Sequence, residues 1–269
     1  MSYRTVIFDR KGPTGIVRLN RPDRMNAVNE EMYSELIEVL EKTAGDTSIR
    51  SLVITGSVRV KDGKEKQAFC AGADLEKHGE GERTHAQKRA YIELAHRATA
   101  GIYRYPRPVI AAVNGPARGA GTEMALNCDF IFMAEDASMA FPETGLGTFV
   151  GGGVTVHLPK MIGVMKAKEL VYTGRVINGD EAVAMGLALE SLPVASLMDR
   201  VLEFCSLLGE KAPVSMKLAK ERLQNSCELD FATALHLETD AILACMDTED
   251  WHEGVQAFAE KRKPQYKGR

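Results

Sequence analysis

The sequence predicts an α/β fold, because short apolar runs of strand length alternate with segments whose apolar residues have helical spacing. Residues 51–55, 109–113 and 130–134 are largely apolar, and the first two are bounded by turn-forming residues, as buried strands usually are. Residues 29–44 precede the first run, and residues 80–105 separate it from the second; both carry a helical pattern. This alternation is typical of an α/β architecture.

Local patterns define the elements before residue 80. Residues 5–9 and 15–19 are β-like runs joined by a turn that contains Gly12-Pro13, which predicts a hairpin. Asn29 is suited to cap a helix that continues to about residue 44. One face of that helix is apolar and carries Met32, Leu36, Val39 and Leu40. The polar and basic stretch 56–67 is expected to be a solvated surface loop.

Helical patterns dominate the second half of the chain. Within residues 80–105 the helix-spaced apolar side chains are Tyr91, Leu94, Ala98 and Ile102. Further helices are predicted at residues 167–172, just after Asn178, and at 195–208, 213–224, 229–245 and 250–261. The sequence has no fixed-period repeat, low-complexity tract or linker that divides it.

The composition is that of an ordinary globular protein. Its 269 residues suffice for one large domain, with 45% hydrophobic and 26% charged residues. A net charge of -3 gives no electrostatic reason to bind nucleic acid or a membrane, so small-molecule substrates are expected. Five widely spaced cysteines without metal-binding spacing predict buried, reduced thiols, and the N-terminus has no apolar signal core. We therefore expect a cytoplasmic protein.

The densest chemical signal lies between residues 109 and 153. The strand-like run 109–113 is followed by a turn, Gly119-Ala120-Gly121, and then by a helical pattern. The first amides of a helix lack intrahelical partners, so the N–H of Ala120 is free to bind developing negative charge. Glu123 lies in the first helical turn, and Glu143 follows Phe141-Pro142 on a predicted loop at a strand end.

Two carboxylates in glycine-rich, apolar surroundings beside free amides are typical of an acid/base site. The alternative is that Glu123 only complements the helix dipole and Glu143 is a solvated loop residue. A second turn, Ala71-Gly72-Ala73-Asp74, allows close approach of a ligand, and the N–H of Ala73 is a second candidate anion donor. A tight turn explains the same residues. From local pattern, both interpretations of each feature stay open.

The histidines carry weaker signals. His78, His85 and His96 lie in a polar segment and are expected to be solvated. His157 follows the glycine-rich stretch and either lines the pocket or packs a helix. The sequence contains neither G-x-S-x-G nor a P-loop, and Gly145-Leu-Gly147 is not the dinucleotide fingerprint.

The motifs taken together resemble the crotonase (enoyl-CoA hydratase/isomerase) superfamily. Their order is Ala71-Gly72-Ala73-Asp74, Asn114-Gly115, Gly119-Ala120-Gly121-Thr122-Glu123 and Phe141-Pro142-Glu143. The likeness covers nearly the whole chain, from residues 19–22 and 25–27 to residues 253–258 and 260–262. Four features depart from the usual pattern: Ala120 stands in the middle of the glycine triplet, Glu76 replaces a common lysine, residues 155–157 replace Thr-Gln-Arg, and the insertion at 57–66 is long.

The resemblance implies a crotonase-like spiral of ββα units over residues 1–195, with the acyl-CoA site, and a helical trimerisation region over residues 196–269. A homotrimer or a hexamer is the implied assembly. The amides of Ala73 and Ala120 would hold the thioester oxygen, and Glu123 and Glu143 would be the two catalytic glutamates. Lys261 would reach CoA from a neighbouring subunit. Residues implied to border the CoA cleft are Met25, Ala27, Ala71, Asp74 and Leu75.

The implied activity is an enoyl-CoA hydratase of fatty-acid β-oxidation type, which adds water across the 2,3 double bond of a 2-enoyl-CoA. CoA would enter as part of the substrate, and no metal or other cofactor is expected. An enoyl-CoA isomerase is the nearest rival. A noncatalytic acyl-CoA-binding or RNA-binding member is the second rival, suggested by the basic residues 59–66. The acyl chain's length, branching and ring character are not specified by these motifs.

Overall fold

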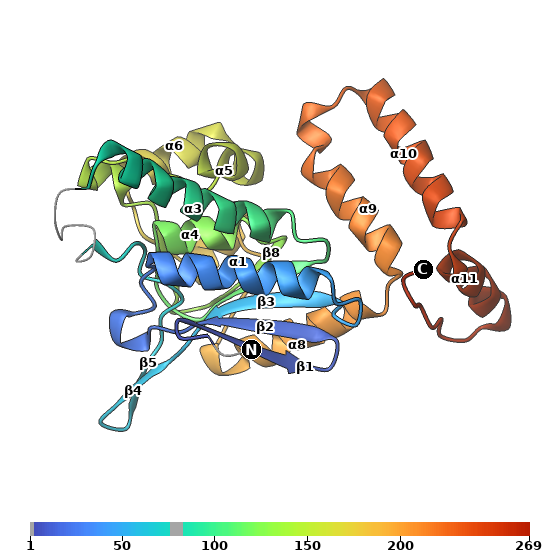
Figure 1. The fold of residues 1–269 in the computed structure, drawn as a ribbon, viewed down its shortest axis with the longest axis horizontal. Coiled ribbons are helices and arrows are strands. Elements are labelled where there is room, and N and C mark those ends of the chain that lie inside the picture. Colours follow the sequence, from blue (N-terminus) through green and yellow to red (C-terminus); the bar gives the residue numbers. More distant parts are fainter. Residues whose placement is uncertain (1–2, 76–82) are drawn as a thin grey trace.

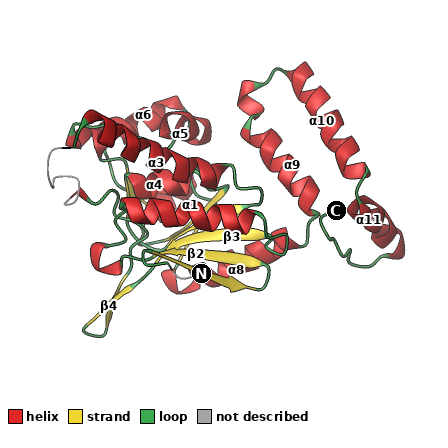
Figure 2. Ribbon diagram, in the orientation of Figure 1, coloured by secondary structure: helices red, strands yellow, loops and turns green. Residues whose placement is uncertain are grey.

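A six-stranded sheet forms the centre of the computed structural model, which describes residues 3–75 and 83–269 (Figures 1 and 2). Its strands lie in chain order: β1 (Val6–Lys11), β2 (Thr14–Leu19), β3 (Ser51–Gly56), β6 (Val109–Val113), β8 (Phe130–Ala134) and β11 (Glu190–Leu192). The β1–β2 pair is the predicted hairpin, with Val6 opposite Leu19, and every later pairing is parallel. The predicted α/β class is confirmed.

Helices cover both faces of this sheet, which is why its central strands are largely apolar. Every residue of β3 and β6 is buried. Figure 1 shows α1 (Glu30–Ala44), α3 (His85–Tyr103) and α4 (Ala120–Leu126) on one side of the sheet. Helix α8 (Val194–Gly209) packs on the other side, where it contacts β2, β3, β6 and β8.

A small second sheet positions the start of α4, which carries Glu123, and the start of η2 (Glu143–Leu146), which carries Glu143. Its strands are β7 (Ala117–Arg118), β9 (Ser138–Ala140) and β10 (Ile177–Asn178), with β9 in the middle. Strand β7 runs parallel to β9 and leads into α4, while β9 leads into the single 3₁₀ turn η2. The parallel pairing therefore places the start of α4 beside the start of η2.

Capping residues mark the starts of two helices: α1 begins after Asn29 as predicted, and α3 begins at His85 within the predicted segment 80–105. The side chain of Asn29 accepts a hydrogen bond from the N–H of Met32 at the start of α1. Thr84 and Gln87 form a capping box at the start of α3. The remaining short elements are η1 (Pro22–Arg24), η3 (Ser226–Glu228), α5 (Val154–Ile162), α6 (Val164–Thr173) and α7 (Gly179–Met185).

The predicted surface loop at residues 56–67 is in part a β-hairpin. The prediction of a loop was therefore wrong, and the prediction that this stretch is exposed to solvent was right for most of it. Strands β4 (Arg59–Lys61) and β5 (Lys64–Lys66) pair antiparallel. Asp62 and Gly63 both have positive φ, at 52° and 70°. A two-residue turn of this kind matches the twist of the strands it joins, and Asp-Gly is well suited to it. The propensity of this dipeptide was the missed signal.

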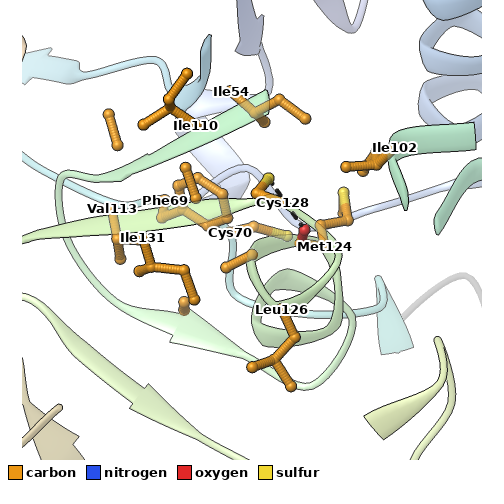
Figure 3. Close-up of a cluster of buried hydrophobic side chains, with 14 of the residues drawn as sticks. Ile54, Phe69, Cys70, Ile102, Ile110, Val113, Met124, Leu126, Cys128 and Ile131 are labelled. Carbon is orange, nitrogen blue, oxygen red and sulfur yellow. Dashed lines mark hydrogen bonds between the residues drawn. The ribbon is translucent and has the colours of Figure 1, made fainter. Parts of the chain in front are cut away.

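The core lies between the sheet and the α1, α3 and α4 layer. Figure 3 shows part of it, where Phe69 and Cys70 from the turn region meet Met124 of α4 and Ile110 of β6. All four side chains are fully buried. This packing leaves little freedom for the backbone on either side of the site. The five cysteines are free, as predicted, but Cys227 is exposed and Cys245 is half-buried, which corrects the expectation of burial for these two.

The C-terminal helices extend away from the sheet (Figure 1). They are α9 (Pro213–Gln224), α10 (Phe231–Met246) and α11 (Glu249–Glu260). No residue of α9 or α10 is buried, and Phe231 and Phe258 are 80% and 88% exposed. Exposed apolar area of this extent is typical of an association surface. The boundary at residues 195/196 and the trimerisation role stay predictions. No helix among the described residues is long and apolar enough to cross a membrane.

Candidate active site

The first candidate anion donor is the backbone N–H of Ala120, at the beginning of α4. Gly119 precedes it with φ 47° and ψ -117°, a conformation that glycine adopts readily and other residues do not. The N–H of Gly119 and the hydroxyl of Thr122 both donate to the carbonyl of Ala140, which ties the helix start to β9. Among the described residues the N–H of Ala120 has no hydrogen-bond acceptor.

The second candidate donor is the N–H of Ala73. Ala73 and Val28 form a parallel β-bridge, in which Val28 N–H donates to Gly72 O and Asp74 N–H donates to Val28 O. Neighbouring amides of an extended chain point to opposite sides, so the N–H of Ala73 points away from Val28. In the described part of the chain it too has no acceptor.

The two turns approach each other more closely than side chains would permit. Arg118 N–H donates to Cys70 O at 2.9 Å. A Cβ on Gly121 would lie 2.3 Å from Cys70 O, and one on Gly72 would lie 2.9 Å from Arg118 O. Only glycine fits at these two positions. The contact brings the turn of Ala73 to the turn that precedes Ala120.

Glu123 lies in the first turn of α4, as predicted, and is 8% exposed. Its Oε1 accepts a hydrogen bond of 2.7 Å from the N–H of Gly151. Asn127 Nδ2 donates to both Glu123 O and Gly152 O, which holds the glycine-rich loop against α4. Burial raises the pKa of the Glu123 carboxyl above its ordinary value, and the Gly151 N–H partly opposes this. The alternative interpretation was that Glu123 only complements the helix dipole. That interpretation does not account for the burial of its carboxylate.

Glu143 begins η2 directly after β9, so the predicted position at a strand end is correct and the predicted loop is a 3₁₀ turn. It is 7% exposed, which overturns the alternative of a solvated loop residue. Its Oε2 is buried and has no hydrogen-bond partner in the described part of the chain. A Cβ on Gly119 would lie 2.7 Å from its Oε1. Glu143 therefore lies against the residue that precedes Ala120.

The two carboxylates influence each other's ionisation. Burial raises the pKa of Glu143, its own backbone N–H opposes the shift, and the charge of Glu123 raises the pKa further. Two neighbouring carboxyl groups resist ionising together, so their protonation is linked. A pair of this kind can supply a base and an acid.

The residues predicted to border a CoA cleft lie together around the turn of Ala73. Ala71 N–H donates to Met25 O, and Met25 has a left-handed φ of 50°. Arg21 links the two segments: one guanidinium nitrogen donates to Ala27 O and the other lies 2.7 Å from the Asp74 carboxylate. This ion pair is largely buried. The remaining predicted residue, Leu75, follows directly and is exposed.

Comparison with known proteins decides the family. The sequence model of the enoyl-CoA hydratase/isomerase family matches residues 10–269. The chain belongs to this family. Relatives include a short-chain-enoyl-CoA hydratase of Clostridium acetobutylicum (32% identical, covering 98% of this chain and 97% of that protein) and a crotonyl-CoA hydratase of Syntrophomonas wolfei (34%, 99% and 99%).

Solved structures of this family match the fold closely. The crystal structure of enoyl-CoA hydratase from Bacillus anthracis superposes with a TM-score of 0.92 at 36% identity, covering 99% of this chain and all of that one. The predicted crotonase fold is thereby confirmed. As a member of the enoyl-CoA hydratase/isomerase family, the protein belongs among enzymes that act on acyl-CoA thioesters.

Within one chain, Lys261 does not lie at the site of Glu123 and Glu143. It ends α11 with a left-handed φ of 55°, is exposed, and lies in the part of the molecule set apart from the sheet (Figure 1). A role on CoA would need a neighbouring subunit and stays a prediction. Within residues 3–75 and 83–269, no cluster of three or more His, Cys, Asp or Glu side chains is arranged to hold a metal ion.

Sequence reasoning did not assign a role to two residues that hold the segments around Ala73 together. Arg21 holds Asp74, and the side chain of Asn26 is buried and bonds to Arg21 N, Ser57 O and Ala68 O. Both lie in the matched motif Arg21-Pro22 to Met25-Asn26-Ala27, which was the available signal. The ring of His157 packs on Tyr103 at 4.7 Å between centroids, so the helix-packing alternative holds for it. His85 is exposed as predicted, and His78 lies outside the described residues.

Proposed function

We propose that this enoyl-CoA hydratase/isomerase family member is a hydratase that converts a 2-enoyl-CoA to a 3-hydroxyacyl-CoA. The observation that carries the proposal is the pair of buried, mutually coupled carboxylates of Glu123 and Glu143 against a turn with an unpartnered N–H at Ala120. Hydration of a conjugated thioester requires an acceptor for charge on the thioester oxygen, a base for water and an acid for the α carbon.

The proposed mechanism uses the free amides first. The N–H groups of Ala73 and Ala120 donate to the thioester oxygen, which becomes negative as water adds to C3. Each such donor contributes about 3 kcal/mol at the transition state. Glu123, held by the N–H of Gly151, takes a proton from the attacking water, and the water oxygen forms the new bond to C3. Glu143 gives a proton to C2.

The hydrogen-bond partners of the two carboxyl groups support this division of labour. Glu143 has the unpartnered Oε2, and a protonated oxygen at that position can deliver its proton into the site. Glu123 has a fixed N–H donor that favours its ionised form, as a base requires. After product release, a proton returns from Glu123 to Glu143 through the coupled pair.

CoA is proposed to lie along the segments that contain Met25, Ala27, Ala71, Asp74 and Leu75, with Lys261 reaching it from a neighbouring subunit. The exposed apolar side chains of α10 and α11 suit the homotrimer or hexamer that this requires. CoA enters only as part of the substrate, and no resident metal or redox group takes part in the steps above.

Steady-state hydration of a panel of enoyl-CoA thioesters, short, long, branched and cyclic, tests the proposal. Turnover of at least one member is expected. Glu123→Gln and Glu143→Gln should each lose most turnover, about 100-fold or more, because each removes a group that transfers a proton. Both variants should still bind the thioester, because the amides are unchanged. Full activity in either variant would refute the assignment.

Isomerisation is the second candidate, because the family that matches includes isomerases. An isomerase needs one glutamate to move a proton along the acyl chain. The position of the double bond after incubation with a 3-enoyl-CoA distinguishes the two. Conversion to the 2-enoyl form without net hydration would favour isomerase. The RNA-binding alternative rests only on the basic residues of the β4–β5 hairpin, a short exposed patch that solvation alone explains.

A further inference from the structure

A third polar side chain faces the Glu123 carboxylate across the open face of Gly151. A Cβ at Gly151 would lie 3.2 and 3.3 Å from the two carboxylate oxygens of Glu123 and 3.4 Å from Nε2 of His96. The two side chains therefore border the same small space. Within the described chain no hydrogen bond joins the two side chains, and an oxygen atom that enters on this side of Gly151 would meet both.

The fold fixes both sides of this space. On one side, the N–H of Gly151 holds Oε1 of Glu123, and Asn127 fixes the neighbouring Gly152. On the other side, α3 packs with Ala98 and Ile102 buried, which sets the rotation of the helix. His96 is on the same helix and is exposed, whereas Glu123 is 8% exposed. The position that a Cβ on Gly151 would take is therefore bordered by one exposed and one buried polar side chain.

We infer that His96 is a further residue of the hydration site, where its Nε2–H donates a hydrogen bond to the oxygen that Glu123 activates. That oxygen belongs to water before addition and to the 3-hydroxyl group of the product afterwards. The imidazole transfers no proton in this role: the water proton goes to Glu123, and His96 only orients the oxygen lone pair toward C3. This inference rests on the proposed hydratase function. It adds a polar side chain from α3 to the site, opposite the Glu123 carboxylate.

The consequence for substrate choice is that the space beside C3 is polar on both sides. An apolar branch at C3 would displace the bridging oxygen, so Nε2 of His96 would lose its proposed contact and the Glu123 carboxylate would keep only the N–H of Gly151. The structure therefore favours 2-enoyl thioesters without a substituent at C3.

The test compares His96→Leu with His96→Gln. Leucine has no donor, whereas the amide nitrogen of glutamine occupies about the place of Nε2, and both residues suit a helix. We expect His96→Leu to lower kcat for hydration about tenfold, equivalent to one hydrogen bond at the transition state, and His96→Gln to recover most of it. His85→Leu, an exposed position about three turns earlier on α3, is the matched control and should leave kcat unchanged.

A second readout separates this role from a general disturbance of the site. Exchange of the α proton of a saturated acyl-CoA in ²H₂O needs only the two amides and Glu143, so it should be unaffected in both His96 variants. Unchanged hydration in His96→Leu would overturn the inference, and so would an equal loss of hydration and exchange. If the wild-type protein exchanges α protons but hydrates no thioester, the proposed function fails and the inference fails with it.

Discussion

Replacing Glu143 with methionine should inactivate the protein and make it more stable. Methionine matches glutamate in length and lacks both its charge and its hydrogen-bond capacity. Oε2 of Glu143 is buried without a partner, and such a group costs about 1–3 kcal/mol in the folded state. The contact of the carboxylate with its own backbone N–H offsets part of that cost. We therefore expect a gain of about 1 kcal/mol, or about 2–4 °C in Tm for a chain of this size.

The gain should depend on pH with a defined sign. Burial and the charge of Glu123 raise the pKa of Glu143 in the folded protein, so folding favours the protonated carboxyl. The stabilisation from protonation is complete below the unfolded pKa of about 4.3 and is lost as pH rises through the folded pKa. The advantage of Glu143→Met should therefore be small near about pH 4 and larger near about pH 8.

Calorimetry at several pH values and a hydration assay provide the measurements. Glu135→Met is the matched control, since Glu135 is exposed after β8 and its replacement should leave hydration unchanged. A Glu143→Met protein that is less stable than wild type at every pH would refute the reasoning about its buried oxygen. Retained hydration would refute the proposed role in proton transfer.

Three further changes test other parts of the site. Gly119→Ala should cost about 1–3 kcal/mol and most of kcat, because Gly119 has φ 47° and its Cβ would lie 2.7 Å from Glu143; wild-type Tm and kcat would contradict this. Asp74→Asn breaks the buried pair with Arg21 and should lower unfolding free energy by about 3 kcal/mol in denaturant titrations, whereas an unchanged midpoint would show the pair to be dispensable. Lys261→Ala should raise KM for the thioester and leave kcat and Tm unchanged; an unaltered KM would remove Lys261 from the CoA site.

Much of the fold follows from local sequence patterns, because the capping residues and the apolar spacing of a segment indicate the same element. Asn29 caps α1 as predicted, and the apolar face of that helix is the one that packs. The largely apolar runs at residues 51–55 and 109–113 are central parallel strands, since such strands are buried on both faces. The β4–β5 hairpin was missed because its residues are polar and exposed, so hydrophobic periodicity carries no signal there.

The site could be predicted only as a set of candidates. Turn and helix-start patterns indicated Ala73, Ala120 and Glu123, but the sequence gives no distance between segments that are far apart in the chain. The contact of Gly119 with Glu143 depends on the parallel pairing of β7 with β9, which no local pattern specifies. His96 was expected to be solvated, and it is exposed; its position opposite Gly151 depends on the packing of α3 against α4.

The most direct test of the central claim is the labelling pattern after reaction of a 2-enoyl-CoA in ²H₂¹⁸O. The account predicts that the wild-type protein places ¹⁸O at C3 and ²H at C2 in equal amounts, and that Glu123→Gln and Glu143→Gln form the doubly labelled product at least about 100-fold more slowly. Deuterium without ¹⁸O, or double labelling by either variant at the wild-type rate, would contradict it.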